Sequence, residues 1–301
     1  VTVTVQPVPA VNVVANQALC NGSSTAAVTF GGVATQYNWI NDTPTIGLST
    51  SGTGNIASFT ALNTGTSPVT ATITITPVYN GCTGATGTFT ITVNPTPVLT
   101  STLTPTAICS GTSFSYTPTS ATAGTTYAWT RAAVVGISQA AGSGTGVINE
   151  TLTNTTVLPL SVVYNIVSTA SGCSNGGQNV VLTVYPTPVL SSTLTASGIC
   201  SGATFGYTPA SATTGTTFAW SRAAVGGISP ATGSGTGNIS EALSSSNSTP
   251  TVVTYVIVST ANGCSNTGEN VTVTVQPVPA VNVVANQTLC NGSSTAAVTF
   301  G

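Results

Sequence analysis

The chain has 301 residues, and 2% of them are charged, whereas about a quarter are charged in an ordinary soluble domain. Two basic residues and no His cannot neutralise a run of phosphates, so the composition excludes nucleic acid as a partner and argues against anionic membranes. No apolar stretch approaches the roughly 18–20 residues of a membrane-spanning helix. Copies with so little surface charge repel one another weakly, which suits a fibre, sheath or anchored stalk better than a freely diffusing enzyme.

Residues 1–31 reappear as residues 271–301, and the copies differ at one position, where Ala18 is replaced by Thr288. The chain begins inside a strand-like segment, VTVTV, without an initiator Met, and we interpret it as a window on a longer protein. After such segments the motif V-x-P-x-P recurs four times. Proline cannot donate to a sheet and fixes φ, so a short, stiff linker is expected after each strand. The predicted linker prolines are Pro7, Pro9, Pro95, Pro97, Pro186, Pro188, Pro277 and Pro279.

The motif returns at intervals of 88, 91 and 91 residues, which predicts tandem units with a full period of 270 residues. We expect 1–7 to be the last strand of a preceding repeat, 8–95 repeat A, 96–186 repeat B, 187–277 repeat C, and 278–301 the start of the next repeat A. Repeats B and C are close copies, because TYAWTRAAVVGIS in B corresponds to TFAWSRAAVGGIS in C. Repeat A is a more distant relative.

Each repeat reads as about seven to nine short strands separated by Gly, Ser, Asn and Pro. One strand carries two aromatics spaced by two, which point to the same face and can enter one core. These pairs are Tyr37 and Trp39, Tyr127 and Trp129, and Phe218 and Trp220. A later strand alternates as Ala71-Ile73-Ile75, Val162-Tyr164-Ile166 and Val253-Tyr255-Ile257. Many strands around one central Trp in about 90 residues predict an all-β protein of tandem immunoglobulin-like sandwiches in a linear array.

Longer strings in repeat B, ICSGTSFSYTP, GSGTGVINETLTN and YNIVSTASGCSN, resemble the PKD-like, Ig-type repeats of very large surface and secreted proteins of Bacteroidota. Repeat A resembles a sister repeat that is often interleaved with them. The resemblance covers essentially the whole chain, although the usual aromatic-rich signature after Trp, with its Gly-Asp-Gly turn, is absent. It implies export by the type IX system, an extracellular or cell-surface location, and a role in adhesion, gliding or extracellular structure.

Every repeat has one cysteine in [IL]-C-[NS]-G near its start and one in G-C-[TS] near its end. Their spacing does not fit zinc, which needs clustered ligands, so in an exported protein we interpret them as structural disulfide cysteines. They are Cys20, Cys82, Cys109, Cys173, Cys200, Cys264 and Cys290. The odd number follows from Cys290, which repeats Cys20 in the incomplete last unit.

Two pairings are open. Pairing within a repeat joins Cys20–Cys82, Cys109–Cys173 and Cys200–Cys264. In an Ig topology, however, these cysteines would lie at opposite ends of a sandwich some 20–25 Å long, whereas bridged Cα atoms lie within about 7 Å. Pairing between successive repeats joins Cys20–Cys173 and Cys109–Cys264, and leaves the other cysteines to partners outside the chain.

Sites for catalysis or cofactors are not indicated, because the chain lacks His, Lys and paired carboxylates, and we predict no enzyme, no cofactor and no metal site. The Gly-rich SGTGN and GSGTGNI stretches are interpreted as tight turns. Arg131 with Glu150, and Arg222 with Glu241, are each 19 residues apart at equivalent positions. We interpret each as an ion pair between neighbouring strands, worth at most about 1 kcal/mol if exposed. A contact with a neighbouring unit is the alternative.

These observations predict a structural, extracellular repeat segment that forms an extended, disulfide-stabilised filament or stalk at or beyond a bacterial cell surface. Its partners are neighbouring repeats of the same chain, and further copies in a fibre are a hypothesis. The alternative function is an adhesin module that contacts glycans or other cells through its Tyr and Trp side chains, although one such pair on an alternating strand favours a place in the core.

Overall fold

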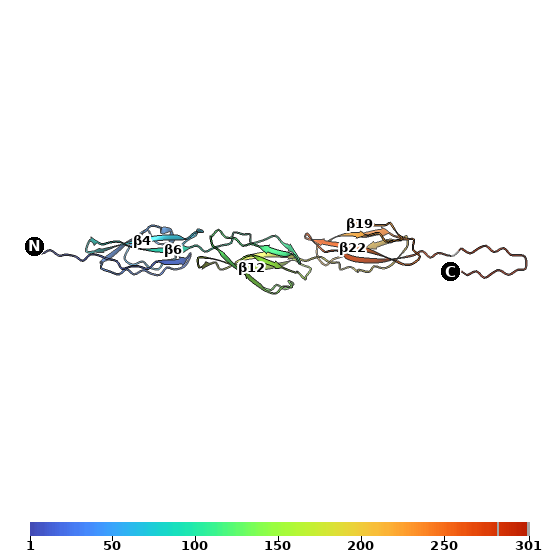
Figure 1. Cartoon of the computed structure of the whole chain (residues 1–301), viewed down its shortest axis with the longest axis horizontal. Coiled ribbons are helices and arrows are strands. Elements are labelled where there is room, and N and C mark those ends of the chain that lie inside the picture. The colour runs from blue at the N-terminus through green and yellow to red at the C-terminus, as the bar shows by residue number, and fades with distance from the viewer. Residues whose placement is uncertain (282, 300–301) are drawn as a thin grey trace. The chain divides into compact units, whose positions relative to one another are not determined.

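The computed structural model of the chain describes residues 1–281 and 283–299. Two compact units can be distinguished, Val1–Thr153 with Leu160–Val184 and Asn154–Pro159 with Tyr185–Gly301. The first unit holds repeat A and nearly all of repeat B, and the second holds repeat C. Every repeat is built from strands, and η1 in repeat A is a single turn of 3-10 helix among the described residues (Figure 1).

Repeat A is built on a sheet with the order β1-β6-β4-β2-β3, and β5 pairs with β4. Its elements are β1 (Gln17–Cys20), β2 (Gln36–Asn41), η1 (Pro44–Ile46), β3 (Ser51–Thr53), β4 (Val69–Tyr79), β5 (Cys82–Thr83) and β6 (Gly87–Asn94). β1 runs parallel to β6, whereas the other paired strands are antiparallel. Bridges at Ser24–Thr60 and Val28–Ile56 join the irregular segments of the opposite layer.

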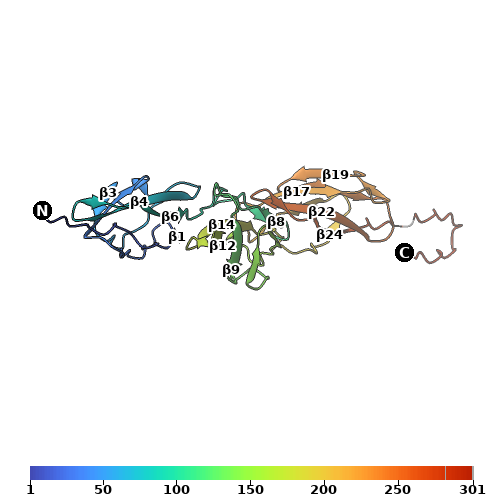
Figure 2. The ribbon, with the colours of Figure 1, turned by 60° about the vertical axis from the view of Figure 1, so that its left-hand side comes forward.

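Repeat B has the same plan with a more regular second layer. Its strands are β7 (Ile108–Cys109), β8 (Ser113–Tyr116), β9 (Thr126–Arg131), β10 (Gly142–Thr145), β11 (Ile148–Thr151), β12 (Leu160–Ala170), β13 (Cys173–Ser174) and β14 (Gln178–Tyr185). The main sheet has the order β10-β9-β12-β14-β7, β13 pairs with β12, and β8 with β11 forms the opposite sheet. Figure 2 shows β9, β12 and β14 together in this repeat, with β8 separate from them.

Repeat C, described by itself, repeats this arrangement. Its strands are β15 (Ile199–Cys200), β16 (Thr204–Tyr207), β17 (Thr217–Arg222), β18 (Ile228–Ser229), β19 (Gly233–Thr236), β20 (Ile239–Ala242), β21 (Ser244–Ser245), β22 (Thr251–Ala261), β23 (Cys264–Ser265) and β24 (Glu269–Gln276). The main sheet has the order β15-β24-β22-β17-β19 with β23 paired to β22, and β16–β20 and β18–β21 are separate pairs. The predicted all-β fold of tandem Ig-like sandwiches is confirmed.

One long alternating strand in each repeat, β4, β12 or β22, contributes buried side chains to the core. Ala71, Ile73 and Ile75 on β4 are at most 1% exposed, and the equivalent side chains on β12 and β22 are fully buried. Trp39 and Trp129 are 7% and 8% exposed, and Trp220 is partly buried against the core of repeat C. Because side chains alternate along a strand, these residues share one face and pack together, as the sequence pattern indicates.

The Gly-rich stretches pack against the indole rings of the tryptophans. Gly144 on β10 lies opposite Trp129 on β9, and a Cβ placed there would come within 2.8 Å of the indole ring. Gly235 lies in the same way against Trp220, at 2.7 Å. The next glycine of the motif, Gly146 in repeat B, has a φ of 68° and forms the tight turn that the sequence predicts. Gly144 therefore provides space for the indole ring, and Gly146 forms the turn.

Candidate functional site: a disulfide junction between repeats

The sequence predicts that the first cysteine of each repeat lies at one end of the sandwich. In repeat A, Cys20 is the last residue of β1 and lies opposite Asn94, the last residue of β6. The backbone N–H of Asn21 donates to the carbonyl of Asn94 at 2.8 Å, which holds the end of β1 against the strand that leads into the linker. Cys20 is therefore presented where repeat A gives way to repeat B.

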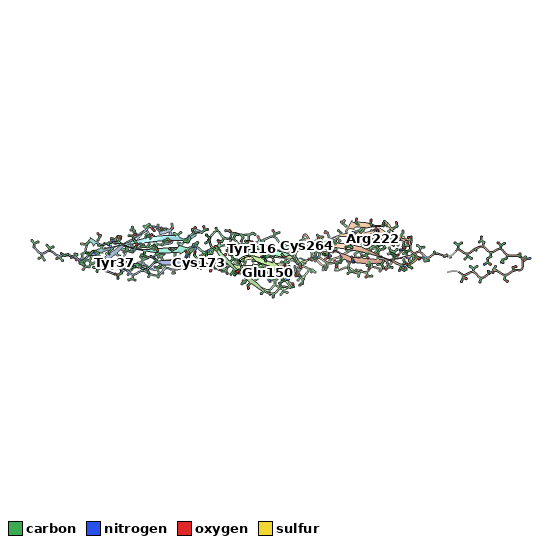
Figure 3. The ribbon with its side chains drawn as sticks, in the orientation of Figure 1. Tyr37, Tyr116, Glu150, Cys173, Arg222 and Cys264 are labelled. Atoms are coloured by element: carbon green, nitrogen blue, oxygen red, sulfur yellow. A yellow bond between two sulfur atoms is a disulfide. The ribbon has the colours of Figure 1, made fainter. Side chains whose placement is uncertain are left out.

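The second cysteine of each repeat lies on a hairpin at the opposite end of the sandwich. In repeat B, β12 and β13 are joined by a two-residue turn in which Ser171 has a φ of 48° and Gly172 a φ of 78°. Positive φ at both turn residues is typical of the tight hairpin turn whose twist matches that of the flanking strands. Cys173, which Figure 3 labels, is the residue after this turn. Its side chain is 1% exposed.

A disulfide joins Cys20 of repeat A to Cys173 of repeat B, with 5.5 Å between their Cα atoms. Beside it, Nδ2 of Asn94 donates a hydrogen bond to the carbonyl of Ser171 at 3.3 Å. Two connections other than the linker therefore tie the end of β6 and β1 to the β12–β13 hairpin. We call this set of residues, Cys20, Asn94, Ser171 and Cys173, the A–B junction.

The linker between these repeats is packed rather than free. Pro95 and Pro97 are buried, and so are Val93 before them and Leu99 after them, at every second position. The backbone N–H of Leu99 donates to Oε1 of Gln178 at 2.6 Å, which ties the start of repeat B to its own β14. Extended chain with alternate burial continues from β6 through the prolines, so the linker holds a fixed conformation in the first unit.

The structure decides between the two cysteine pairings for repeats A and B. Pairing within repeats is wrong for Cys20–Cys82 and Cys109–Cys173, because Cys20 is bonded to Cys173, and for Cys200–Cys264, because Cys200 is a free thiol. Cys82, Cys200 and Cys290 are free and exposed within the described chain, and their pairing with partners outside it stays a prediction. The physical reason is the predicted one, since the two cysteines of a repeat lie at opposite ends of its sandwich. Cys109 and Cys264 are not free thiols, and their pairing with each other stays a prediction.

The Arg–Glu pairs lie in the sandwich interior and join its two sheets. Arg131 on β9 is 2% exposed, and its Nε and Nη2 donate to Glu150 on β11 at 2.8 and 3.0 Å. Tyr164 on β12 donates its hydroxyl to the same carboxylate at 2.6 Å, and Nη2 of Arg131 also donates to the carbonyl of Ala140. The interpretation as a pair on neighbouring strands is therefore wrong, because β9 and β11 belong to different sheets.

Burial and hydrogen bonding set the protonation of this cluster. Burial acts to raise the pKa of Glu150, but hydrogen bonds from Arg131 and Tyr164 outweigh it and hold the pKa below its ordinary value. Burial and the bond to Glu150 raise the pKa of Tyr164 well above its ordinary value. Repeat C has the same cluster, in which Arg222 and Tyr255 both bond to Glu241.

Repeat A replaces the whole cluster rather than one member. Asn41 stands in place of the arginine, is 5% exposed, and donates from Nδ2 to the carbonyl of Leu48 at 3.0 Å. Ile73 lies opposite Asn41 where Tyr164 lies opposite Arg131 in repeat B. Counted from the turn glycine of the SGTGN motif, Ser58 takes the position of Glu150. Removal of all three together leaves no buried charge unpaired, and for that reason the fold tolerates it.

Nothing in the described residues indicates a catalytic or metal centre. Residues 1–281 and 283–299 contain no group of three His, Cys, Asp or Glu side chains that could hold a metal ion. No helix in that part of the chain is long and apolar enough to cross a membrane. The junction residues that the sequence did not predict are Asn94 and Ser171, and the signal for Asn94 is its place directly before Pro-x-Pro.

The family match agrees with this fold. The PKD-like domain family matches the chain three times, over residues 13–97, 106–188 and 197–279. No curated protein matches the chain in sequence. Among solved structures, a mutated variant of titin domains I67–I69 is 13% identical with a TM-score of 0.45, and the alignment covers 90% of this chain and 99% of that one. The N-terminal eight Ig domains of Down syndrome cell adhesion molecule are 12% identical with a TM-score of 0.44, covering 91% and 37%.

At these identities and TM-scores, the two structures carry no conclusion about function. The three family matches together span most of the chain and contain one Trp-centred core each. The chain therefore belongs to the PKD-like domain family and carries three of its repeats in tandem.

Proposed function

We propose that this chain is a structural segment of an extracellular filament or stalk at or beyond a bacterial cell surface. The observation that carries the proposal is the A–B junction, in which a disulfide and a hydrogen bond join successive repeats alongside a buried linker. A binding module needs exposed recognition groups, whereas the polar side chains with the strongest interactions here are buried inside sandwiches. A spacer needs links that resist extension, and the junction supplies them.

Two further features support an extracellular location. Disulfides form and persist in oxidising compartments, and four cysteines of this chain are disulfide-bonded. A chain with 2% charged residues suits material in which association between copies is tolerated. The tryptophans do not offer a glycan platform, because Trp39 and Trp129 are buried in their cores and Trp220 is partly buried.

The test is immunogold electron microscopy of intact cells with an antibody raised against the repeats. The proposal expects gold along filaments or stalks outside the cell, and loss of the label after external protease treatment. Label that appears only after permeabilisation would contradict the location. Label confined to the tips or to contact zones between cells would favour the adhesin alternative.

A further inference from the structure

The two sulfurs of the A–B disulfide differ in their access to solvent. The side chain of Cys173 is 1% exposed, whereas Cys20 at the end of β1 is partly exposed. A reducing thiol opens a disulfide by attacking one sulfur, and the other sulfur leaves as a thiolate. Access therefore sets the direction of the reaction, with attack at Cys20 and Cys173 as the leaving group.

The surroundings of the leaving sulfur disfavour a thiolate. Sγ of Cys173 lies 3.9 Å from the carbonyl oxygen of Ser171, and Sγ of Cys20 lies 4.0 Å from that of Gly172. These oxygens are the negative ends of peptide dipoles, so they oppose a negative charge on sulfur. Because Cys173 is buried, water does not solvate that charge in their place.

The same environment recurs at the second cysteine of repeat C. Cys264 is 2% exposed, and its Sγ lies 3.9 Å from the carbonyl oxygen of Asn262, the first residue of the equivalent turn. Burial of the sulfur against a turn carbonyl is therefore a property of this hairpin in both repeats.

The composition leaves the A–B junction without a positively charged side chain. The chain has two such side chains and no His. These two, Arg131 and Arg222, are bound to glutamates inside the sandwiches of repeats B and C. Cysteines that exchange readily have a neighbouring cation or another feature that stabilises the thiolate, and a buried thiol without one is inert.

We propose that the A–B disulfide resists thiol–disulfide exchange as long as the β12–β13 hairpin is folded, and that a small thiol attacks it only at Cys20. In that step the thiolate of the reagent forms a bond to Sγ of Cys20 and the Cys20–Cys173 bond breaks. The electron pair stays on Sγ of Cys173, which then takes a proton from water. A second molecule of reagent attacks the reagent sulfur of the mixed disulfide, releases Cys20 and forms the oxidised reagent.

The experiment follows this one disulfide in the full chain with five cysteines replaced by serine, namely Cys82, Cys109, Cys200, Cys264 and Cys290. Reduced glutathione is added in native buffer and in urea that unfolds the repeats, free thiols are alkylated at intervals, and peptides are mapped by mass spectrometry. Reduction is expected to be about a hundredfold slower in native buffer, with glutathione on Cys20 and the alkyl group on Cys173. Equal rates in the two solutions, or glutathione on Cys173, would overturn the proposal. The same map of the unsubstituted chain shows whether the five substitutions change the result.

Asn94 offers a test of the electrostatic argument, because its Nδ2 bonds to the same carbonyl that Sγ of Cys173 contacts. Asn94→Lys and Asn94→Gln both lengthen the side chain, but only the first places a cation beside the disulfide. Asn94→Lys is expected to be reduced about tenfold faster than Asn94→Gln in native buffer, and at the same rate in urea. Equal rates in native buffer would show that the missing cation does not protect the bond.

The inference rests on the A–B junction of the proposed function. Its failure would leave the disulfide in place but open to exchange. The extracellular location is tested separately by the immunogold label, so the two failures can be distinguished.

Discussion

The A–B junction has a mechanical consequence that can be measured on single molecules. When the chain is pulled from its ends, tension reaches Cys20, crosses the disulfide and continues from Cys173. The 153-residue separation between these cysteines is thereby shielded from force. A fully stretched chain spans about 3.3–3.6 Å per residue, so the disulfide withholds about 500 Å of contour length.

The perturbation is Cys20→Ser, introduced into a chain whose Cys109, Cys200, Cys264 and Cys290 are already serine. Cys82 is kept, so that the pairing within repeat A can still form if it is preferred. The assay is force spectroscopy with handles at the two termini. Without Cys20→Ser the fully unfolded chain is expected to be about 500 Å shorter than with it, because the shielded loop cannot extend.

Two results would refute the reasoning. Equal contour lengths with and without Cys20→Ser would show that no disulfide at Cys20 carries tension. A difference of about 200 Å would show that Cys20 is bonded to Cys82, 62 residues away, instead of to Cys173. Reduction with a thiol reagent must lengthen the parent chain by the same amount as the substitution does, which is the internal control.

Three further predictions concern the interiors of repeats B and C. Glu150→Gln is expected to lower the free energy of unfolding of repeat B by about 3 kcal/mol at pH 7, since it leaves a buried Arg131 without its anion, and denaturant titration with a probe in repeat B checks this. The lowered pKa of Glu150 means that its contribution is present above its ordinary pKa of about 4.5 and is lost as pH falls through the lower folded value. Acid titration of the parent chain should therefore show a loss of stability below about pH 4.5 that is reduced in Glu150→Gln. Gly235→Ala is expected to lower the free energy of unfolding of repeat C by about 1–3 kcal/mol, because its Cβ meets the ring of Trp220. The control is Gly206→Ala, whose Cβ meets nothing within 4 Å and which is expected to be neutral or stabilising. Thermal unfolding followed by Trp fluorescence checks both variants, and equal effects would contradict the packing argument.

The alternating pattern and the Pro-x-Pro spacing were enough to predict the class of fold and the tandem organisation. The cysteine positions, combined with Ig topology, left two pairings open, and one of them is the pairing between repeats A and B. The sequence did not predict which group each buried polar side chain bonds to. Arg131 and Glu150 stand 19 residues apart in any conformation, but whether they meet at the surface or between two sheets depends on how the sheets pack.

The two nearly identical termini distinguish structure that depends on local sequence from structure that depends on tertiary contacts. VTVTV belongs to β24 at residues 271–275, paired with β22, but forms no strand at residues 1–5, where no sheet partner is present. Conversely, Gln17 bonds through its side chain to the backbone of Ala26, and Gln287 bonds to Ala296 in the same way. The short-range contact thus forms in both copies, because its two partners are only nine positions apart in the sequence.

The strand that begins at Gln17 has no counterpart at Gln287. Residues 17–20 are β1, held by the parallel β6, and Leu19 packs against the core of repeat A. Residues 287–290, nearly identical in sequence, form no strand, and Leu289 is 46% exposed. Strand propensity, turns and cysteine spacing are therefore properties of the sequence itself. Strand formation and the burial of its side chains were decided by the tertiary structure, because a strand is stabilised by the sheet hydrogen bonds and core contacts that its neighbours supply.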